Sequence, residues 1–239
     1  MTNVMWLAIA IGNTHIRAAV FDGLELAAEY VKPHIELPEL EYELGQWSID
    51  RIALASVVPD LVTPWHGLAH THEITSDRVP LQGIYSSMGV DRALVVLGAG
   101  VTYGYPILVI DAGTALTITG VDTTPALVGG AILPGLRSQF NSLRQNGALL
   151  PLARIPSELP TLWATDTITA IQSGVIHAVV AGLRRYIADW QKQFPRSQVI
   201  ITGGEGEYIR SYLQGGKLDN QLIFWGMRSL WQQLEKSRV

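Results

Sequence analysis

The sequence contains no cysteine, which excludes disulfide bonds and thiolate metal sites. A chain without cysteine suits a reducing compartment, and we expect a soluble, cytoplasmic protein. Charge is also scarce, because only 16% of the residues are charged and the formal net charge is −4. This acidic balance lacks the positive potential of a general nucleic-acid binder, so we expect no nucleic-acid partner.

The sequence also lacks an uninterrupted apolar run long enough to span a membrane. Residues 93–110 come nearest to that length, but four residues interrupt them: Gly98, Gly100, Gly104 and Pro106. This pattern predicts a buried helix, a turn and a buried strand. The apolar N-terminus lacks a basic leader and a small-residue cleavage site, and we expect no membrane partner.

Hydrophobic residues, by contrast, are plentiful. They make up 48% of the 239 residues, which is ample for a core and argues against disorder. A chain of this length forms one large domain or two of modest size.

Residues 7–22, LAIAIGNTHIRAAVFD, form a phrase that occurs twice. An apolar run, a Gly-Asn-Thr turn and a second apolar run are typical of a β-hairpin, and residues 107–122, ILVIDAGTALTITGVD, have the same plan. Gly12 matches Gly113, and a repeat at this distance predicts two similar domains. Glycine and exposed N–H groups suit phosphate oxygens, so we expect a phosphate-bearing ligand in a cleft between the domains.

The remaining elements follow from apolar periodicity and from turn residues. We place the domain boundary near residue 104, which gives domains 1–104 and 105–239. Outside the two hairpins, we expect strands at 25–31, 51–58, 72–75, 127–133, 197–202 and 221–224, and helices at 41–47, 59–70, 93–101, 136–146, 167–190, 205–213 and 227–236.

Three glycine turns, at Gly12, Gly113 and Gly203-Gly204, end or follow apolar strands. Tight-turn geometry alone explains any one of them. Three in this order resemble the two phosphate turns and the adenosine turn of the actin/hexokinase/sugar-kinase superfamily.

Six phrases together resemble the type III pantothenate kinase family. They are IGNTHIR (11–17), YSSMGVDR (85–92), IDAGTALT (110–117), GGAILPGL (129–136), DTITAIQSG (166–174) and ITGGEGE (201–207). The resemblance implies an α/β fold of two ribonuclease-H-like domains, with mixed sheets flanked by helices and an inter-domain cleft. It also implies transfer of the ATP γ-phosphoryl group to pantothenate, giving 4'-phosphopantothenate for coenzyme A synthesis.

The same resemblance implies a role for individual residues. Asp91 matches the general base, although the residue pattern alone is equally typical of a helix cap. Asp111 matches the ligand of a monovalent cation, K⁺ or NH₄⁺, and Mg²⁺ accompanies ATP. A homodimer is implied, with the helix from Thr167 as a candidate interface. The matched pantothenate contacts are Tyr85, Gly89, Val90, Arg92 and Thr167, and the matched ATP contacts are Ala10, Ile11, Gly12, Asn13, Thr14, His15, Ile16, Arg17 and Thr114.

Ala10 departs from the family pattern, which has aspartate at this place in the first turn. That carboxylate would hold Mg²⁺ against the ATP phosphates, directly or through water. The chain is therefore either a kinase with weak or no activity, or one in which phosphates and water alone hold Mg²⁺. A non-catalytic regulator of the accessory transcription factor type is the main alternative, and Ala10 favours it. Another small-molecule kinase of the superfamily is a further alternative.

The histidines have plainer explanations. His66 and His70 have helical spacing, and His70 and His72 have strand spacing, which would allow a zinc site. No further ligand cluster accompanies them, so surface histidines are the preferred interpretation. We expect His177 to be a core histidine in its helix.

Overall fold

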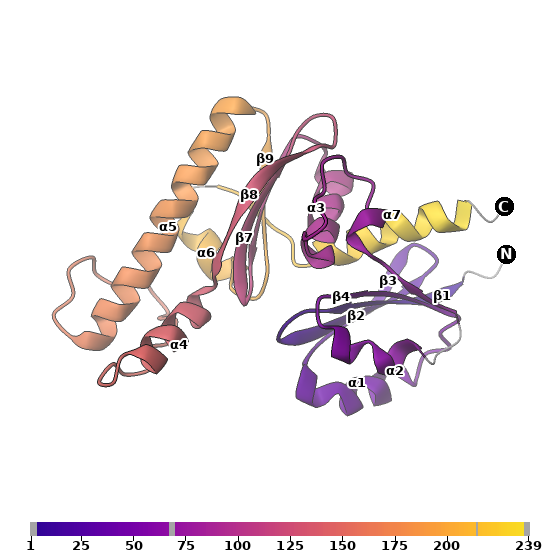
Figure 1. The fold of residues 1–239 in the computed structure, drawn as a ribbon, viewed down its shortest axis with the longest axis horizontal. Coiled ribbons are helices and arrows are strands. Elements are labelled where there is room, and N and C mark those ends of the chain that lie inside the picture. The colour runs from indigo at the N-terminus through magenta and orange to yellow at the C-terminus, as the bar shows by residue number, and fades with distance from the viewer. Residues whose placement is uncertain (1–3, 67–69, 214, 237–239) are drawn as a thin grey trace. The chain divides into compact units, whose positions relative to one another are not determined.

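The computed structural model describes residues 4–66, 70–213 and 215–236, and it divides into two compact units. Unit 1 comprises residues 1–102 and 221–239, and unit 2 comprises residues 103–220. Each unit is built on one five-stranded sheet with helices on its faces (Figure 1).

The sheet of unit 1 has the strand order β3-β2-β1-β4-β5. The first three strands form an antiparallel meander, and β4 and β5 continue from β1 in parallel. The bounds are β1 Met5–Ile11, β2 His15–Asp22, β3 Glu25–Pro33, β4 Arg51–Ser56 and β5 Thr71–Glu73.

One face of this sheet holds a core of branched residues, among them Leu7, Ile9 and Ile11 of β1. The helices on this side are α1, Leu37–Leu44, and α2, Thr63–His66. Leu40 and Leu44 of α1 belong to the same core, and they recur at helical spacing, which explains how a short helix can cover the sheet.

The other face of the unit 1 sheet packs against α7, Leu222–Lys236. Trp6 lies between Phe21 and Trp231, with ring centroids 4.4 and 4.6 Å apart in stacked geometry. Such aromatic stacking adds to the burial of apolar area. It attaches the C-terminal helix to the first strand of the chain.

Helix α7 also contacts α3, Val90–Tyr103, through two glycines. A Cβ atom on Gly98 would overlap the carbonyl oxygen of Leu222, and a Cβ atom on Gly226 would overlap that of Leu94. The two helices therefore approach backbone to backbone, which only glycine allows at these positions.

Unit 2 repeats the topology of unit 1. Its strand order is β10-β9-β6-β7-β8, again with an antiparallel meander and with parallel strands continuing from the first strand of the hairpin. The repeat seen in the sequence is thus confirmed in the fold. The bounds are β6 Ile107–Ala112, β7 Ala115–Val121, β8 Leu127–Pro134, β9 Gln198–Thr202 and β10 Lys217–Leu218.

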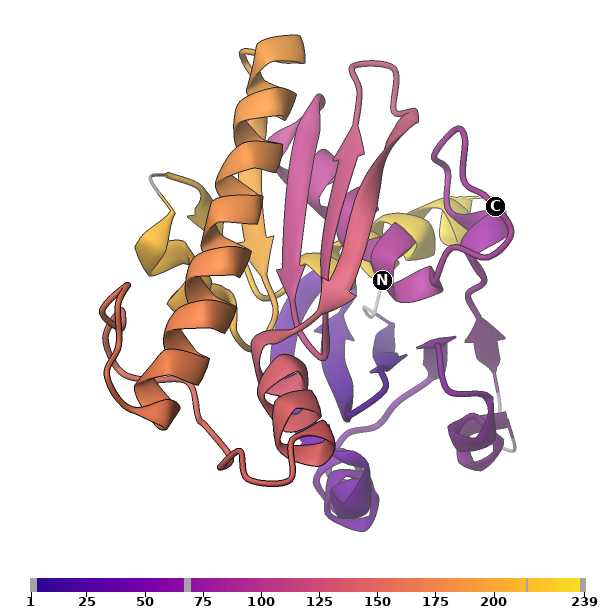
Figure 2. The ribbon, with the colours of Figure 1, turned by 60° about the vertical axis from the view of Figure 1, so that its left-hand side comes forward.

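The helices of unit 2 are α4, Leu136–Asn146, α5, Thr167–Gln193, and α6, Gly206–Tyr212. Helix α5 runs along one face of the sheet (Figure 2), and it buries a stripe of apolar residues that includes Ile176 and Leu183. Gly120 of β7 leaves room for the ring of Trp190, which a Cβ atom would overlap. No helix among the described residues is long and apolar enough to cross a membrane.

Most predicted elements are present, and four details differ. The strand expected at 221–224 is the first turn of α7, because a short apolar run is equally compatible with a buried helix. The short strand β10 was missed, and α1 begins at Leu37 rather than at residue 41. The helix expected at 59–70 is a 3₁₀ turn, Pro59–Leu61, followed by α2; residues 67–69 lie outside the described residues, and His70 has a positive φ of 63°.

The expected division at residue 104 also needs a correction. Residues 221–239 cluster with unit 1, although the sequence prediction assigned them to the second domain. The physical reason is the packing of α7, because Trp231 stacks on Trp6 and Gly226 contacts the α3 backbone.

Candidate functional site

The turn of the first hairpin lies at the carboxyl edge of the unit 1 sheet. Strands β1 and β4 are parallel and in register, so Ile11 and Ser56 end at the same edge. The turn is closed by a hydrogen bond of 3.0 Å from the Gly12 N–H to the His15 carbonyl. The Nε2 atom of His34 lies 2.8 Å from the Gly12 carbonyl oxygen, so the carbonyl group of Gly12 is held in place as well as its N–H group.

Asp91 lies in the first turn of α3, close to this edge. Its Oδ1 atom accepts a hydrogen bond of 2.7 Å from the Arg92 N–H. A Cβ atom on Gly89 would stand 2.5 Å from that same oxygen and 3.7 Å from Cγ1 of Val57. Val57 in turn donates its N–H to the Ile11 carbonyl at 3.0 Å. Val57 thus contacts both the end of β1 and the segment that carries Asp91.

Burial raises the pKa of the Asp91 carboxyl, and the hydrogen bond from the Arg92 N–H offsets this only in part. Desolvation disfavours the charged form of a carboxylate, which makes the ionised group a stronger base. A strengthened base at the carboxyl edge of an α/β sheet is the arrangement expected of a proton acceptor.

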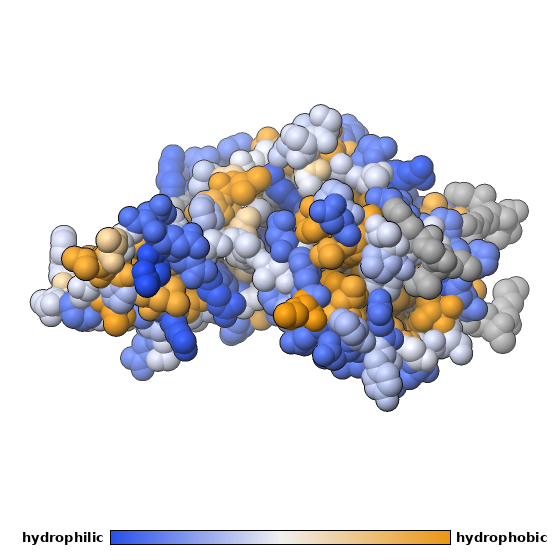
Figure 3. Space-filling view, turned by 60° about the horizontal axis from the view of Figure 1, so that its bottom comes forward, coloured by the Kyte–Doolittle hydropathy of each residue, from blue (hydrophilic) through white to orange (hydrophobic). Residues whose placement is uncertain are grey.

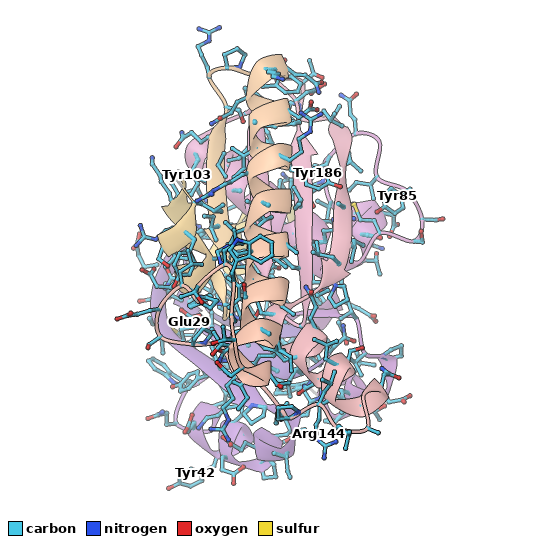
Figure 4. The ribbon with its side chains drawn as sticks, turned by 90° about the vertical axis from the view of Figure 1, so that its left-hand side faces the viewer. Glu29, Tyr42, Tyr85, Tyr103, Arg144 and Tyr186 are labelled. Carbon is cyan, nitrogen blue, oxygen red and sulfur yellow. The ribbon has the colours of Figure 1, made fainter. Side chains whose placement is uncertain are left out.

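Arg92 and Tyr85 form a polar pair beside Asp91. Nη1 of Arg92 donates a hydrogen bond of 2.8 Å to the Tyr85 hydroxyl oxygen. Arg92 is 8% exposed, whereas Tyr85 is 44% exposed and reaches the surface (Figure 4). Unit 1 therefore brings together Tyr85, Gly89, Asp91 and Arg92. Val90 is buried, so its side chain is part of the core.

The first turn presents three exposed residues, Asn13, Thr14 and His15. Ile11 and Ile16 on either side are buried in the core, so only their backbone groups are available to a ligand. This agrees with a turn that binds phosphate mainly through N–H groups.

Arg17 makes contacts that its family role does not predict. Its Nη2 atom donates to Oε1 of Glu29 at 2.9 Å, and its guanidinium lies 5.2 Å from the Phe224 ring centre. Glu29 also accepts a hydrogen bond of 3.0 Å from Nε2 of Gln221. Arg17 thus ties β2 to β3 and to the segment that begins α7.

Ala10 lies directly opposite Arg17 in the β1–β2 pairing and is 4% exposed. Its methyl group offers no ligand to a cation. Across the described residues, no group of three or more histidine or acidic side chains could hold a metal ion. The residues of the first turn therefore do not fit a Mg²⁺ ion bound by protein carboxylates, and no zinc site forms in the described part of the chain.

In unit 2, Asp111 lies at the end of β6 beside the turn that follows β9. A Cβ atom on Gly203 would stand 2.6 Å from Oδ1 of Asp111 and 2.5 Å from the Ala112 carbonyl oxygen. Gly203 has a φ of +91°, so both its conformation and its close contacts require glycine. A carboxylate with a nearby carbonyl oxygen is an oxygen donor set that suits a hard cation.

Thr114 and Thr167 lie on separate segments of unit 2. The Thr114 carbonyl accepts hydrogen bonds from the Gly135 N–H at 2.9 Å and from the Ser138 hydroxyl at 2.7 Å. Thr167 is the exposed first residue of α5, and Asp166 caps that helix by accepting from the Thr169 N–H at 3.0 Å. The helix start predicted at Thr167 is confirmed, and its role as a substrate contact stays a prediction.

Sequence reasoning missed three residues that support these turns: His34, Glu29 and Glu205. Glu205 is 5% exposed and accepts hydrogen bonds from the Leu136 and Arg137 N–H groups at 2.9 and 3.2 Å. An acidic residue directly after Gly203-Gly204 was the available signal. His34 and Glu29 have no such signal, because only the sheet register brings them to the first hairpin.

Comparisons with known proteins show which family the chain is similar to. Residues 6–189 match the family model described as type III pantothenate kinase. A type III pantothenate kinase of Synechococcus sp. (strain JA-2-3B'a(2-13)) is 41% identical over 219 residues, which cover 91% of this chain and 82% of that protein.

Solved structures share the fold at lower identity. A protein assigned to the Baf family of transcriptional activators from Campylobacter jejuni has a TM-score of 0.67 and 22% identity, covering 96% of this chain and 99% of its own. A protein assigned as a 2-dehydro-3-deoxygalactonokinase from Sinorhizobium meliloti has a TM-score of 0.61 and 13% identity, covering 96% of each chain. The expected fold class is confirmed, while the inter-domain cleft stays a prediction.

The raised pKa of Asp91 predicts a pH-dependent effect on stability. A carboxyl whose pKa is raised by folding destabilises the folded state once it ionises. We expect Asp91→Asn to increase the free energy of unfolding at neutral pH, and the gain to disappear as the pH falls below the ordinary aspartate value of 3.8. Urea unfolding across this pH range measures it, with the exposed residue Asp60→Asn as the control. A gain of equal size at every pH would contradict burial as the cause.

Proposed function

The chain belongs to the type III pantothenate kinase family, and we propose that it transfers the γ-phosphoryl group of ATP to the hydroxyl of pantothenate. The products are ADP and 4'-phosphopantothenate, and the reaction is the first step toward coenzyme A. The observation that carries the proposal is the partly buried Asp91 carboxylate, which lies against Gly89 and is linked through Val57 to the turn of the first hairpin.

In the proposed reaction, the carboxylate of Asp91 accepts the proton of the pantothenate hydroxyl. The hydroxyl oxygen then forms a bond to the γ-phosphorus, and the bond from that phosphorus to the bridging oxygen of ADP breaks. Phosphoryl transfer depends mainly on positioning and on charge neutralisation. A positioned general base typically contributes about 10²–10⁴-fold.

The remaining predicted site residues have supporting roles in this proposal. Tyr85, Gly89, Arg92 and Thr167 contact pantothenate, with Val90 supplying backbone only. Residues 10–17 and Thr114 contact ATP through turn N–H groups and the two threonine side chains. Asp111 holds K⁺ or NH₄⁺, which would neutralise phosphate charge. Mg²⁺ enters with ATP, since Ala10 offers it no ligand.

A non-catalytic regulator on the same fold is less well supported. Ala10 is its one favourable feature, whereas Asp91, Arg92 and Asp111 are all present. The likeness to the Campylobacter jejuni protein, at 22% identity, concerns the fold alone.

The homodimer that we propose uses an apolar surface of unit 2, the α5-start surface, defined here as Leu159, Leu162, Trp163 and Ile168. These side chains are 43–88% exposed, and Figure 3 shows apolar residues gathered at the left-hand end of the view, where this part of the chain lies. The loop is held on α5, because the Ser173 hydroxyl donates to the Leu162 carbonyl at 2.9 Å. A fixed apolar surface of this kind commonly marks an interface.

The function is tested by a coupled assay of ADP release with and without pantothenate and K⁺. We expect pantothenate-dependent turnover in the wild-type chain and a loss of about 10²–10⁴-fold in kcat for Asp91→Asn, because the base is removed. Asp60→Asn, on an exposed turn, should match the wild type. ADP release that does not depend on pantothenate, or an Asp91→Asn variant with full activity, would refute the proposal.

Ala10→Asp tests the consequence of the missing carboxylate. We expect it to raise kcat at limiting Mg²⁺ by about tenfold, the lower end of the usual effect of a group that orients a metal site. Ala10→Asn has the same shape without the charge and serves as the control. Equal turnover in all three proteins would mean that ATP phosphates and water hold Mg²⁺ without protein help.

The dimer is tested by sedimentation velocity. We expect the wild-type chain to sediment as a dimer and the double variant Trp163→Ser, Ile168→Ser to dissociate at least tenfold more readily, since each substitution removes roughly 1–3 kcal/mol of apolar burial. Tyr42→Ser removes an equally exposed aromatic residue from α1 and should leave the dimer intact. A monomeric wild type, or a double variant that dimerises normally, would exclude this interface.

A further inference from the structure

Glu205 is a buried acidic residue for which the proposed reaction has no role. It directly follows Gly203-Gly204, lies between β9 and α6, and is 5% exposed. Burying a carboxylate is costly unless hydrogen bonds compensate for the lost water. Its partners are therefore informative.

The side chain of Glu205 binds the start of α4. Oε2 accepts from the Leu136 N–H at 2.9 Å, and Oε1 accepts from the Arg137 N–H at 3.2 Å. These are among the first N–H groups of the helix, where the positive end of the helix dipole favours an anion. Because both are occupied by the protein's own carboxylate, they do not serve as a phosphate site.

The backbone of Glu205 binds a second segment. Its N–H donates to the Ala112 carbonyl at 2.9 Å, which attaches the turn after β9 to the hairpin turn between β6 and β7. That hairpin turn is attached to the α4 start as well, because Thr114 accepts from the Gly135 N–H and from the Ser138 hydroxyl. The close contact between Gly135 and the Gly113 carbonyl reinforces the same junction.

Three segments are thus linked in a closed ring, in which each is hydrogen-bonded to the other two. They are the turn at 112–114, the α4 start at 135–137 and the turn at 203–205. The side chain of Glu205 makes the link between the last two. Replacing the carboxylate by an amide removes one of the two hydrogen bonds in this link and leaves the links to the turn at 112–114 in place.

We propose that Glu205 is a positioning residue for nucleotide binding, which holds the turns carrying Thr114 and Gly203-Gly204 in their binding geometry. The inference rests on the proposed function, because those turns are the predicted contacts for ATP phosphate and adenosine. Glu205 acts through the backbone of these turns and does not itself contact the nucleotide. The proposed pantothenate contacts Tyr85, Gly89 and Arg92 lie on unit 1, and Thr167 lies at the start of α5, outside the three segments of the ring. The effect is therefore specific for the nucleotide.

Glu205→Gln is the informative variant, because glutamine keeps the size of the side chain but can accept at one oxygen only. Its amide nitrogen then faces a backbone N–H group, and both are donors. Loss of one charge-assisted hydrogen bond of this kind typically changes an equilibrium by about tenfold. Glu207→Gln is the matched control, since Glu207 lies two residues further on, is exposed, and pairs with Arg210 at 2.8 Å.

The experiment measures KM for ATP and for pantothenate, together with the Kd for ADP by calorimetry. For Glu205→Gln we expect KM for ATP and Kd for ADP to rise about tenfold while KM for pantothenate stays within about twofold. Glu207→Gln should match the wild type. Unchanged nucleotide constants, or equal rises for both substrates, would overturn the proposal.

The ADP measurement separates this inference from the proposed function. A wild-type chain that binds ADP without phosphorylating pantothenate refutes the kinase assignment, and the comparison of Kd values still decides on Glu205. A wild-type chain that does not bind ADP overturns both. If Glu205→Gln does not fold, Ser138→Ala is the second variant. It removes one of the two hydrogen bonds to the Thr114 carbonyl and leaves the one from the Gly135 N–H, so the ring is weakened at its exposed side. A rise in Kd for ADP of about threefold is expected from the loss of one neutral hydrogen bond.

Discussion

The contact between α3 and α7 determines the position of the candidate base. Gly98 and Gly226 allow the two helix backbones to touch, which places α3 against α7, and the stacking of Trp231 on Trp6 attaches α7 to β1. Asp91 stands in the first turn of α3, so its distance from the hairpin turn is set by packing along the rest of that helix. A side chain at either glycine would push the helices apart and move the carboxylate with them.

The two units show how one topology can serve different purposes. Both place a glycine turn at the carboxyl edge of a sheet, beside a parallel strand. In unit 2 the second-last residue of the strand before the turn is Asp111, whereas in unit 1 the matching residue is Ala10, opposite Arg17. Arg17 pairs with Glu29 of β3 instead. The charge of Arg17 is therefore neutralised from β3 and not from the residue opposite it on β1.

Much of this architecture was predictable from the sequence, because its strongest signals are local. The repeated hairpin phrase predicted two similar sheets, and the apolar stripe from Ile168 to Ile187 predicted a long helix. The segment at 221–224 was assigned wrongly, since Leu222, Ile223 and Phe224 are compatible with a strand or a buried helix, and only contact with α3 decides between them. Within the site, Gly89, Asp91 and Arg92 share one phrase and were found together. His34 and Glu29 could not be found, because only strand register brings them to the first turn. Glu205 was missed although it directly follows Gly203-Gly204, because its role depends on loop packing against the start of α4.

The order in which the chain is made has a consequence for unit 1. Residues 103–220 form a unit whose sheet and helices are contiguous in sequence, and they can fold as soon as they leave the ribosome. The sheet of unit 1 cannot complete its packing until later, because Trp6 is covered by Trp231, a residue synthesised more than two hundred positions later. Until α7 emerges, the alanine-rich and aromatic face of β1 is open to water, and a chaperone that recognises exposed apolar strands would find its target there.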